Sequence, residues 1–168
     1  MNTDPAIELS ATVGRLLKAK GENLVTAESC TGGGVAEAIT AVPGSSEWFD
    51  RGFITYSNEA KQQMLKVSAA TLACHGAVSE NTAREMALGA LAASPGTVSV
   101  SVTGVAGPTG GSPAKPVGMV CFAWARSGEA VPRSETRHFS GDRERVRRQS
   151  VVRALQGIVE LLDDGAGV

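Results

Sequence analysis

The chain is organised around residues Leu24 to Gly34, LVTAESCTGGG. Two apolar residues lead into an acidic residue, a hydroxyl, a thiol and three glycines, and helical sequence follows. We interpret this order as a strand, a sharp turn and a helix start. The turn places Ser29 and Cys30 where the first amides of a helix lack internal acceptors and can hold an anion or a developing oxyanion. The simpler alternative is that Thr31 caps the helix and the glycines ease a tight turn.

Length and composition are typical of one globular domain. The chain has 168 residues, which suffice for one hydrophobic core and are too few for two comfortable domains, so we predict a single domain over 1–168. The formal net charge is -1 and 42% of the residues are hydrophobic. This balance disfavours binding to nucleic acid or to a membrane surface, and it favours a small soluble ligand.

Membrane, secretion and metal signals are absent from the sequence. No apolar run approaches the roughly 18 residues of a membrane span, and Asp4 and Glu8 lie where a signal peptide carries positive charge. We therefore expect a cytoplasmic location. The three cysteines are widely spaced, and His75 and His138 lie in no ligand pattern. We expect no disulfide framework, no metal site and no cofactor.

Hydrophobic periodicity and capping residues predict the order of the elements. A first helix opens at Asp4-Pro5, ends at Gly21 and is expected to cover the sheet, and the apolar stripe of the helix after Ser79 is expected to pack on it. The predicted strands are Leu24–Glu28, Gly52–Tyr56, Val98–Val102, Val117–Ala125 and Ser134–Phe139. The further helices are Gly33–Val42, a segment capped by Asn58 that runs to Leu65, Ala69–Cys74, Glu80–Ala93 and Gly141–Leu162, with a short helical turn at Gly44–Phe49.

This order predicts an α/β protein, a three-layer α/β/α sandwich. Strands and helices alternate in the first part of the chain, whereas the last three strands follow one another with no helix between them. Hairpins are expected there, so the sheet of about five strands is mixed. Within Val98–Val102 valines alternate with serines, which predicts that the two faces of this strand meet different environments.

A second loop carries a pattern suited to a ligand. The tract Thr103–Pro116, TGVAGPTGGSPAKP, follows the valine strand and contains four glycines and three prolines. Ligands gather at the carboxyl ends of strands in open α/β sheets, and glycines let amides approach a phosphate closely. The alternative is a plain hairpin loop. Arg143, in the first turn of the last helix, can complete a phosphate clamp, while most of the arginines there are expected to form a solvated face that is partly paired with Glu.

A serine nucleophile needs a base, and lysine suits this sequence better than histidine. Neither histidine has a context that supports a Ser-His-Asp triad. Lysine can serve when burial lowers its pKa toward neutrality, and Lys61 follows the second strand closely enough to reach the sheet edge that carries Ser29. The alternative is an exposed helical lysine. A further hypothesis makes Cys30 the nucleophile, because a helix N-terminus favours a thiolate.

Six motifs follow one another along the chain: AESCTGGGVAEAIT, PGSSEWFDRGFITYSNEAK, GAVSE, SVTGVAGPTGG, KPVG and FSGDRERVRR. In this order they resemble the signature of the CinA C-terminal domain family, the nicotinamide-nucleotide amidases. The resemblance covers about 24–155, and the start at the first helix resembles the stand-alone form of the domain. It implies hydrolysis of the carboxamide of nicotinamide mononucleotide to nicotinate mononucleotide and ammonia, a step in pyridine nucleotide recycling.

The resemblance also implies roles for single residues. Ser29 matches the family's nucleophile and Lys61 its base, and Tyr56 matches a further active-site position. The hypothesis is that Ser29 attacks the carboxamide carbon while Lys61 takes its proton directly or through Tyr56, and that amides of the turn stabilise the oxyanion. The expected substrate- and phosphate-binding residues are Cys30, Thr31, Gly32, Gly33, Ser46, Asn58, Thr103, Gly104, Gly107 and Arg143.

A function of another class stays open at this point. The family name also suggests a non-catalytic module that binds nucleotides or partner proteins and is linked to competence or DNA damage. An assay of ammonia release separates the two. We further expect a homodimer or a higher homo-oligomer, because soluble enzymes of this size are often symmetric assemblies. Acceptance of the nucleoside or the dinucleotide is also open.

Overall fold

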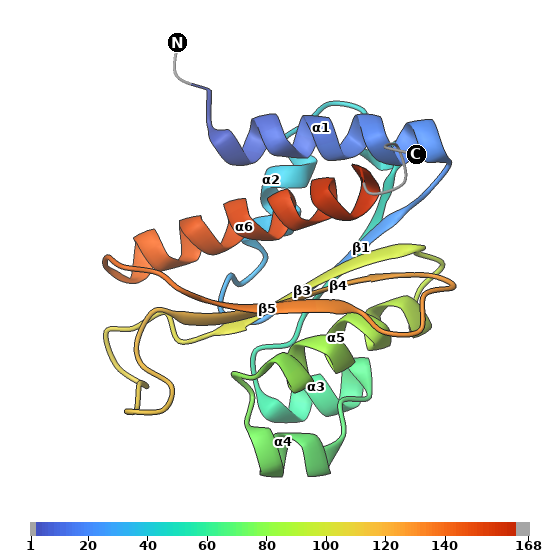
Figure 1. The fold of residues 1–168 in the computed structure, drawn as a ribbon. Coiled ribbons are helices and arrows are strands. Elements are labelled where there is room, and N and C mark those ends of the chain that lie inside the picture. The colour runs from blue at the N-terminus through green and yellow to red at the C-terminus, as the bar shows by residue number, and fades with distance from the viewer. Residues whose placement is uncertain (1–2, 164–168) are drawn as a thin grey trace.

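The fold is a five-stranded sheet with helices on both faces (Figure 1). The computed structural model describes residues 3–163, so the two ends of the predicted domain, 1–2 and 164–168, lie outside the described residues. The strands are β1 (Leu24–Glu28), β2 (Phe49–Ile54), β3 (Val98–Gly104), β4 (Met119–Arg126) and β5 (Arg133–His138). The helices are α1 (Pro5–Lys20), α2 (Gly34–Thr40), the 3-10 turn η1 (Ser45–Glu47), α3 (Asn58–Leu65), α4 (Ala69–His75), α5 (Glu80–Ala92) and α6 (Arg143–Asp163).

The sheet is mixed, as predicted. Its strand order is β2-β1-β3-β4-β5. The strand β1 runs parallel to both β2 and β3, whereas β4 and β5 join by antiparallel pairing. In the register, Glu28 at the end of β1 lies beside Ile54 of β2 and Val102 of β3. The carboxyl ends of three parallel strands therefore meet at one edge of the sheet, where open α/β sheets bind ligands.

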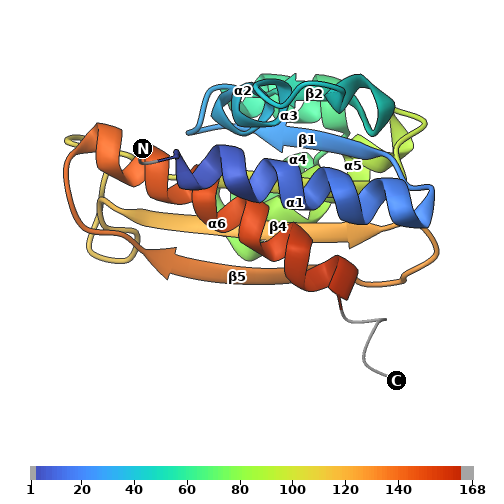
Figure 2. The same ribbon diagram turned by 90° about the horizontal axis from the view of Figure 1, so that it is seen from above.

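Three layers are present, which confirms the predicted sandwich. Helices α1, α2 and α6 lie on one face of the sheet, and α3, α4 and α5 lie on the other (Figures 1 and 2). The helix α5 packs on β3 and β4, as its apolar stripe predicts. The helix α1 packs mainly against α6 and α2, while its Val13 and Leu17 share one core cluster with Leu24 of β1.

The alternating valines and serines of β3 do face different surroundings. Val100 and Val102 belong to the core cluster under α1 and α6. On the other face, the hydroxyl of Ser99 donates to the carbonyl of Ala87 at 2.8 Å, and the hydroxyl of Ser101 donates to a carbonyl of the same helix, α5. Both serines are fully buried. Their hydroxyls find acceptors in the helix backbone, so burial leaves no donor unpaired.

Some predicted boundaries around the second strand are wrong. The strand β2 spans Phe49–Ile54 instead of Gly52–Tyr56, because its pairing with β1 starts opposite Leu24. Ser57 caps α3 in place of Asn58: its backbone is extended, and its hydroxyl accepts from the amide of Ala60 at 3.0 Å. Asn58 is already the first helical residue. The sequence offers two capping residues in a row, and only the backbone conformation distinguishes them.

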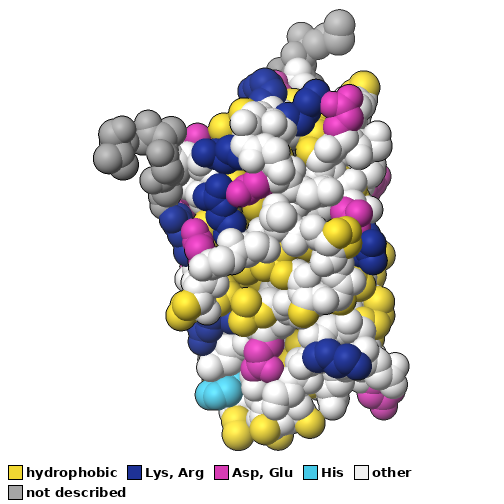
Figure 3. All heavy atoms as spheres, turned by 90° about the vertical axis from the view of Figure 1, so that its right-hand side faces the viewer, with side chains coloured by type: hydrophobic (Ala, Val, Ile, Leu, Met, Phe, Trp, Pro, Cys, Tyr) yellow, Lys and Arg dark blue, Asp and Glu magenta, His cyan; other side chains and the backbone are white. Residues whose placement is uncertain are grey.

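The surface agrees with the balanced composition. On the face that Figure 3 shows, basic and acidic side chains lie interspersed. Among the described residues, no helix combines the length and the apolar character that crossing a membrane requires.

Candidate active site

The first functional side chain stands where β1 ends. Ser29 directly follows this strand, is 7% exposed, and its amide donates to the carbonyl of Val102 on β3 at 2.9 Å. The chain then turns sharply through Gly32 and Gly33, which have φ of 62° and 106°. These angles lie in the left-handed region that glycine adopts without steric cost. The predicted strand, turn and helix start therefore form, with Ser29 at the first position of the turn.

The second functional side chain reaches Ser29 from α3. Lys61 is 1% exposed, and its Nζ lies 3.0 Å from Oγ of Ser29. The same nitrogen lies 2.8 Å from the carbonyl oxygen of Thr55 and 3.1 Å from that of Tyr56. A neutral amine has two N–H donors and one lone pair. In the structure Nζ donates to Oγ of Ser29, and the Ser29 hydroxyl lies 3.5 Å from the carbonyl oxygen of Tyr56. When the amine is neutral, the two carbonyls can accept both of its N–H donors, which leaves the lone pair for the proton of the Ser29 hydroxyl.

Burial makes this neutral form accessible. It lowers the pKa of Lys61 from 10.5 to about 8, because the buried site disfavours the ammonium ion. The exposed helical lysine that served as the alternative is thus excluded. Lys61 is instead a buried amine whose protonation changes close to physiological pH.

Cys30 is not suited to be the nucleophile. Its side chain is 6% exposed and belongs to the core cluster. Burial raises the pKa of its thiol to about 12, so the thiol stays protonated at neutral pH. This contradicts the premise of a helix-stabilised thiolate, because burial raises the pKa of this thiol more than the nearby Arg147 and Lys61 lower it.

The start of α2 is neither an open anion site nor a helix capped by Thr31, the two interpretations of its sequence. The amides of Val35 and Ala36 donate to the carboxylate of Glu28 at 2.9 and 3.1 Å, so these helix amides are not open to an anion. The hydroxyl of Thr31 also donates to Glu28, at 2.6 Å, and does not cap the helix. Within residues 3–163, the backbone amides of Thr31 and Gly33 donate to no backbone carbonyl. These amides of the turn itself, ahead of α2, are the donors left for an oxyanion.

Arg143 joins the glycine tract to the end of β2. One of its guanidinium nitrogens donates to the carbonyl of Gly107 at 2.8 Å, and another donates to the hydroxyl of Tyr56 at 3.2 Å. Gly107 has φ of 81°, and an added Cβ would lie 2.4 Å from a methyl of Val117. Tyr56 is 63% exposed, and its hydroxyl faces Arg143, whereas its carbonyl faces Lys61. The contact between Lys61 and Ser29 is direct, so it needs no relay through the Tyr56 hydroxyl.

The remaining candidate binding residues do not all lie near Ser29. Thr103 lies buried at the carboxyl end of β3, where its hydroxyl donates to the carbonyl of Ala77 at 2.8 Å. Gly104 follows it as the last residue of β3, and Asn58 is exposed at the start of α3. Ser46 is exposed in η1, which precedes β2. It therefore lies at the amino end of the parallel strands, away from Ser29, and the structure does not bring it to this site.

Two residues that hold the site escaped the sequence analysis. Glu28 precedes Ser29 and is 1% exposed, and its role depends on donors that come from the following turn and helix. Arg147 of α6 donates to the carbonyls of Cys30 and Thr31 at 3.1 and 3.3 Å. A signal for Arg147 exists in its position one helical turn after Arg143, which places both side chains on one side of α6.

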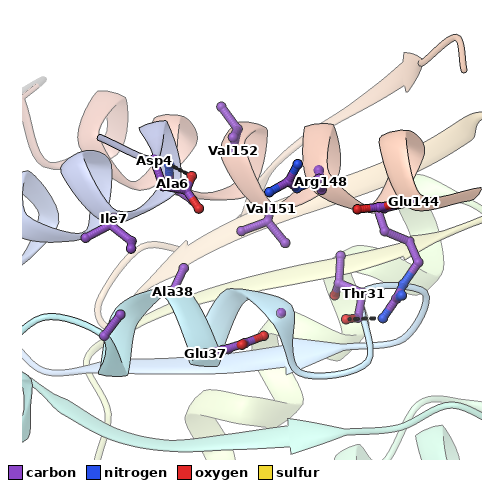
Figure 4. Close-up of a pocket in the computed structure, with 13 residues that line it drawn as sticks. Asp4, Ala6, Ile7, Thr31, Glu37, Ala38, Glu144, Arg148, Val151 and Val152 are labelled. Carbon is purple, nitrogen blue, oxygen red and sulfur yellow. Dashed lines mark hydrogen bonds between the residues drawn. The ribbon is translucent and has the colours of Figure 1, made fainter. Parts of the chain in front are cut away.

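A cavity of about 320 Å³ lies behind the turn, between α1, α2 and α6 (Figure 4). Thr31 and Gly34 line it, together with apolar residues such as Val151, but Ser29 and Lys61 do not. The dashed contact at Thr31 in Figure 4 is the one from Arg147. Within the described residues, no three His, Cys, Asp or Glu side chains gather in a way that would hold a metal ion.

Fold and site together define an α/β sandwich protein with a buried serine–lysine pair at the carboxyl ends of its parallel strands. Residues 6–162 match the family model of the CinA C-terminal domain, and the chain belongs to this family.

Relatives of known name cover nearly the whole chain. The Escherichia coli K12 protein named nicotinamide-nucleotide amidohydrolase PncC is 56% identical, over 93% of this chain and 94% of that protein. The Pseudomonas putida protein of the same name is 51% identical, over 94% of this chain and 98% of that protein. A CinA-like protein from Chloroherpeton thalassium is 48% identical over 92% of this chain, which spans 37% of that longer protein.

Solved structures share the fold. A CinA superfamily protein from Klebsiella pneumoniae aligns with a TM-score of 0.90 at 40% sequence identity, over 95% of this chain and 98% of that one. A competence/damage inducible protein from Agrobacterium tumefaciens aligns with a TM-score of 0.89 at 42% identity, over 96% of this chain and 98% of that one.

Proposed function

We propose that this chain is a nicotinamide-nucleotide amidohydrolase that uses Ser29 as nucleophile and Lys61 as base. The observation that carries the proposal is the 3.0 Å contact between the Lys61 amine and the Ser29 hydroxyl, because both groups are buried and the amine has a lowered pKa. The names of the PncC relatives support the choice of substrate, nicotinamide mononucleotide. Its products are nicotinate mononucleotide and ammonia, as expected for pyridine nucleotide recycling.

The first half of the reaction forms an acyl-enzyme. Oγ of Ser29 attacks the carboxamide carbon while Nζ of Lys61 takes the hydroxyl proton. The carbonyl oxygen becomes an oxyanion, for which the open amides of Thr31 and Gly33 are the proposed donors. The C–N bond then breaks, Lys61 returns its proton to the nitrogen, and ammonia leaves.

The second half of the reaction releases the product. A water molecule attacks the ester carbon and gives a proton to Lys61. The bond to Oγ breaks, Ser29 regains its proton from Lys61, and nicotinate mononucleotide leaves. Every proton in both halves passes through one amine, so the sequence of steps requires a base whose pKa lies near the working pH.

We place the 5′-phosphate of the substrate beside Arg143. The guanidinium of Arg143 lies between the glycine tract and Tyr56, at the edge of the sheet that carries Ser29. A guanidinium can bind a phosphate with two parallel hydrogen bonds, and glycines allow close approach of the backbone. The predicted homo-oligomer stays a prediction, and the chemistry does not depend on it because Ser29 and Lys61 belong to one chain.

The direct test is ammonia release from nicotinamide mononucleotide by the purified chain. We expect steady turnover by the wild type and none above background by Ser29→Ala. Ser10→Ala is the matched control, since Ser10 is a buried serine of α1 whose hydroxyl donates only within its own helix. A wild-type chain that binds the nucleotide and releases no ammonia would instead favour the non-catalytic binding module.

A further inference from the structure

The carboxylate of Glu28 is buried directly beneath the nucleophile turn. Glu28 is the last residue of β1 and is 1% exposed. It accepts three hydrogen bonds: from the hydroxyl of Thr31 at 2.6 Å, from the amide of Val35 at 2.9 Å and from the amide of Ala36 at 3.1 Å. No Lys, Arg or His of the described residues forms an ion pair with it. Burial of a carboxylate is costly, so these three donors are what keeps it in place.

These bonds span the turn from one end to the other. The carboxylate precedes Ser29 by one residue, whereas its donors lie in the middle of the turn and in the first turn of α2. The negative charge also lies at the positive end of the α2 dipole, which favours it further. Glu28 thereby closes the segment 28–36 into a loop with a defined shape, and Ser29 is part of that loop.

A second side chain, from α6, also holds this turn. Arg147 of α6 donates to the carbonyls of Cys30 and Thr31 at 3.1 and 3.3 Å. Thr31 is therefore held at both ends, its hydroxyl by Glu28 and its carbonyl by Arg147. The carbonyl of Cys30 and the amide of Thr31 belong to one planar peptide and point in opposite directions. The contact from Arg147 to this carbonyl therefore turns the Thr31 amide away from α6, where it is free for a substrate oxygen.

We propose that Glu28 is a positioning residue for the reaction: its carboxylate holds the turn so that Oγ of Ser29 faces Nζ of Lys61 while the turn amides stay open. This role rests on the proposed function. Glu28 does not touch the substrate, and it takes no proton in the reaction. Its effect falls on kcat, because Glu28 maintains the geometry of attack and of the oxyanion, whereas the proposed phosphate site is at Arg143, beside Gly107.

The test replaces the carboxylate with an amide of the same shape. In Glu28→Gln one oxygen becomes an NH2 group, which faces an N–H or O–H donor and cannot accept from it. Glu80→Gln is the matched control: Glu80 also lies at a helix start and accepts two hydroxyl hydrogen bonds, from Ser134 and Thr136 on β5, at the other edge of the sheet. Both variants are first compared with the wild type by thermal unfolding, so that rates refer to folded protein.

We expect kcat for ammonia release to fall about 10²-fold in Glu28→Gln with KM changed less than about threefold, since small misplacement of a reacting group has effects of this size. Glu80→Gln keeps kcat within about twofold of the wild type. Three results would overturn the proposal: folded Glu28→Gln keeps the wild-type kcat, only its KM changes, or Glu80→Gln loses as much kcat as Glu28→Gln. If Glu28→Gln does not fold, Thr31→Val decides, because it removes only the 2.6 Å bond, and an unchanged kcat there overturns the proposal as well.

A second readout separates this proposal from the proposed function. A fluorophosphonate probe reacts with an activated serine: the bond from Oγ to phosphorus forms, fluoride leaves, and the base takes the proton. We expect the rate of Ser29 modification to fall in Glu28→Gln and not in Glu80→Gln, while its pH midpoint stays near that of Lys61 in the wild type. Labelling that follows this pattern in a chain that releases no ammonia would sustain the positioning role and reject the substrate. Equal labelling of all three proteins, or none in the wild type, rejects the role.

Discussion

The pH dependence of turnover follows from the burial of Lys61. The base must be neutral to accept the Ser29 proton, and burial lowers its pKa from 10.5 to about 8. About half of the amine is neutral at pH 8, about one tenth at pH 7 and about one hundredth at pH 6. We therefore predict that kcat/KM rises about tenfold per pH unit below pH 8 and becomes level above it. The shift itself corresponds to about 3 kcal/mol of disfavoured ammonium ion.

The assay is initial-rate ammonia release from nicotinamide mononucleotide between pH 6.5 and 9.5, at substrate concentrations below KM. The lower limit avoids protonation of the substrate phosphate, whose second pKa lies near about 6. Preincubation at each pH, followed by assay at pH 8, controls for loss of folded enzyme. A midpoint near 10.5, the ordinary value for lysine, or a rate that falls as the pH rises through 8 would refute the role of neutral Lys61.

Three further predictions concern single side chains. Lys61→Met abolishes turnover and changes how stability depends on pH. Between pH 8 and 10.5 the unfolded wild type binds more protons than the folded form, so its free energy of unfolding rises with pH. Urea unfolding should therefore show the wild type gaining about 1.4 kcal/mol of stability per pH unit over the variant in that window, and nothing below pH 8. A wild-type-to-variant difference that is constant with pH would contradict the lowered pKa. Arg143→Met raises KM for the mononucleotide about 10- to 100-fold, as expected for a lost charged hydrogen bond, with no such rise for the corresponding nucleoside. An equal change for both substrates would place the phosphate elsewhere. Cys30→Ala keeps kcat within about threefold of the wild type, because the thiol is protonated, and a complete loss of turnover would restore the cysteine as nucleophile.

Local sequence patterns predict most of the fold. The order of apolar run, polar turn and glycines at Leu24–Gly34 is short-range chemistry, so the strand, the turn and α2 follow from it. The alternation in β3 and the stripe of α5 are likewise periodic signals. The strand β2 lacks such a signal, since most of its side chains are exposed at the edge of the sheet. Its boundaries are set by its pairing with β1, and this pairing cannot be predicted from a local sequence pattern.

The sequence predicts the site residues that follow the ends of strands. It does not predict those whose position depends on contacts between distant parts of the chain. Ser29 and Lys61 follow neighbouring parallel strands, so their meeting agrees with the topology. Arg147 belonged to a basic helix face expected to be solvated, and only the packing of α6 beside the turn gives it two carbonyl acceptors. Ser46 illustrates the reverse case, because its motif resembles that of the family while the fold places it at the far end of β2.

In the proposed reaction Ser29 bears the acyl group during turnover. This acyl group can be detected by mass spectrometry of peptides from enzyme that is acid-quenched while it hydrolyses nicotinamide mononucleotide. We expect an added mass of substrate minus ammonia on the peptide that contains Ser29, and none in Ser29→Ala. An adduct on any other residue, or turnover by Ser29→Ala at the wild-type rate, would contradict it.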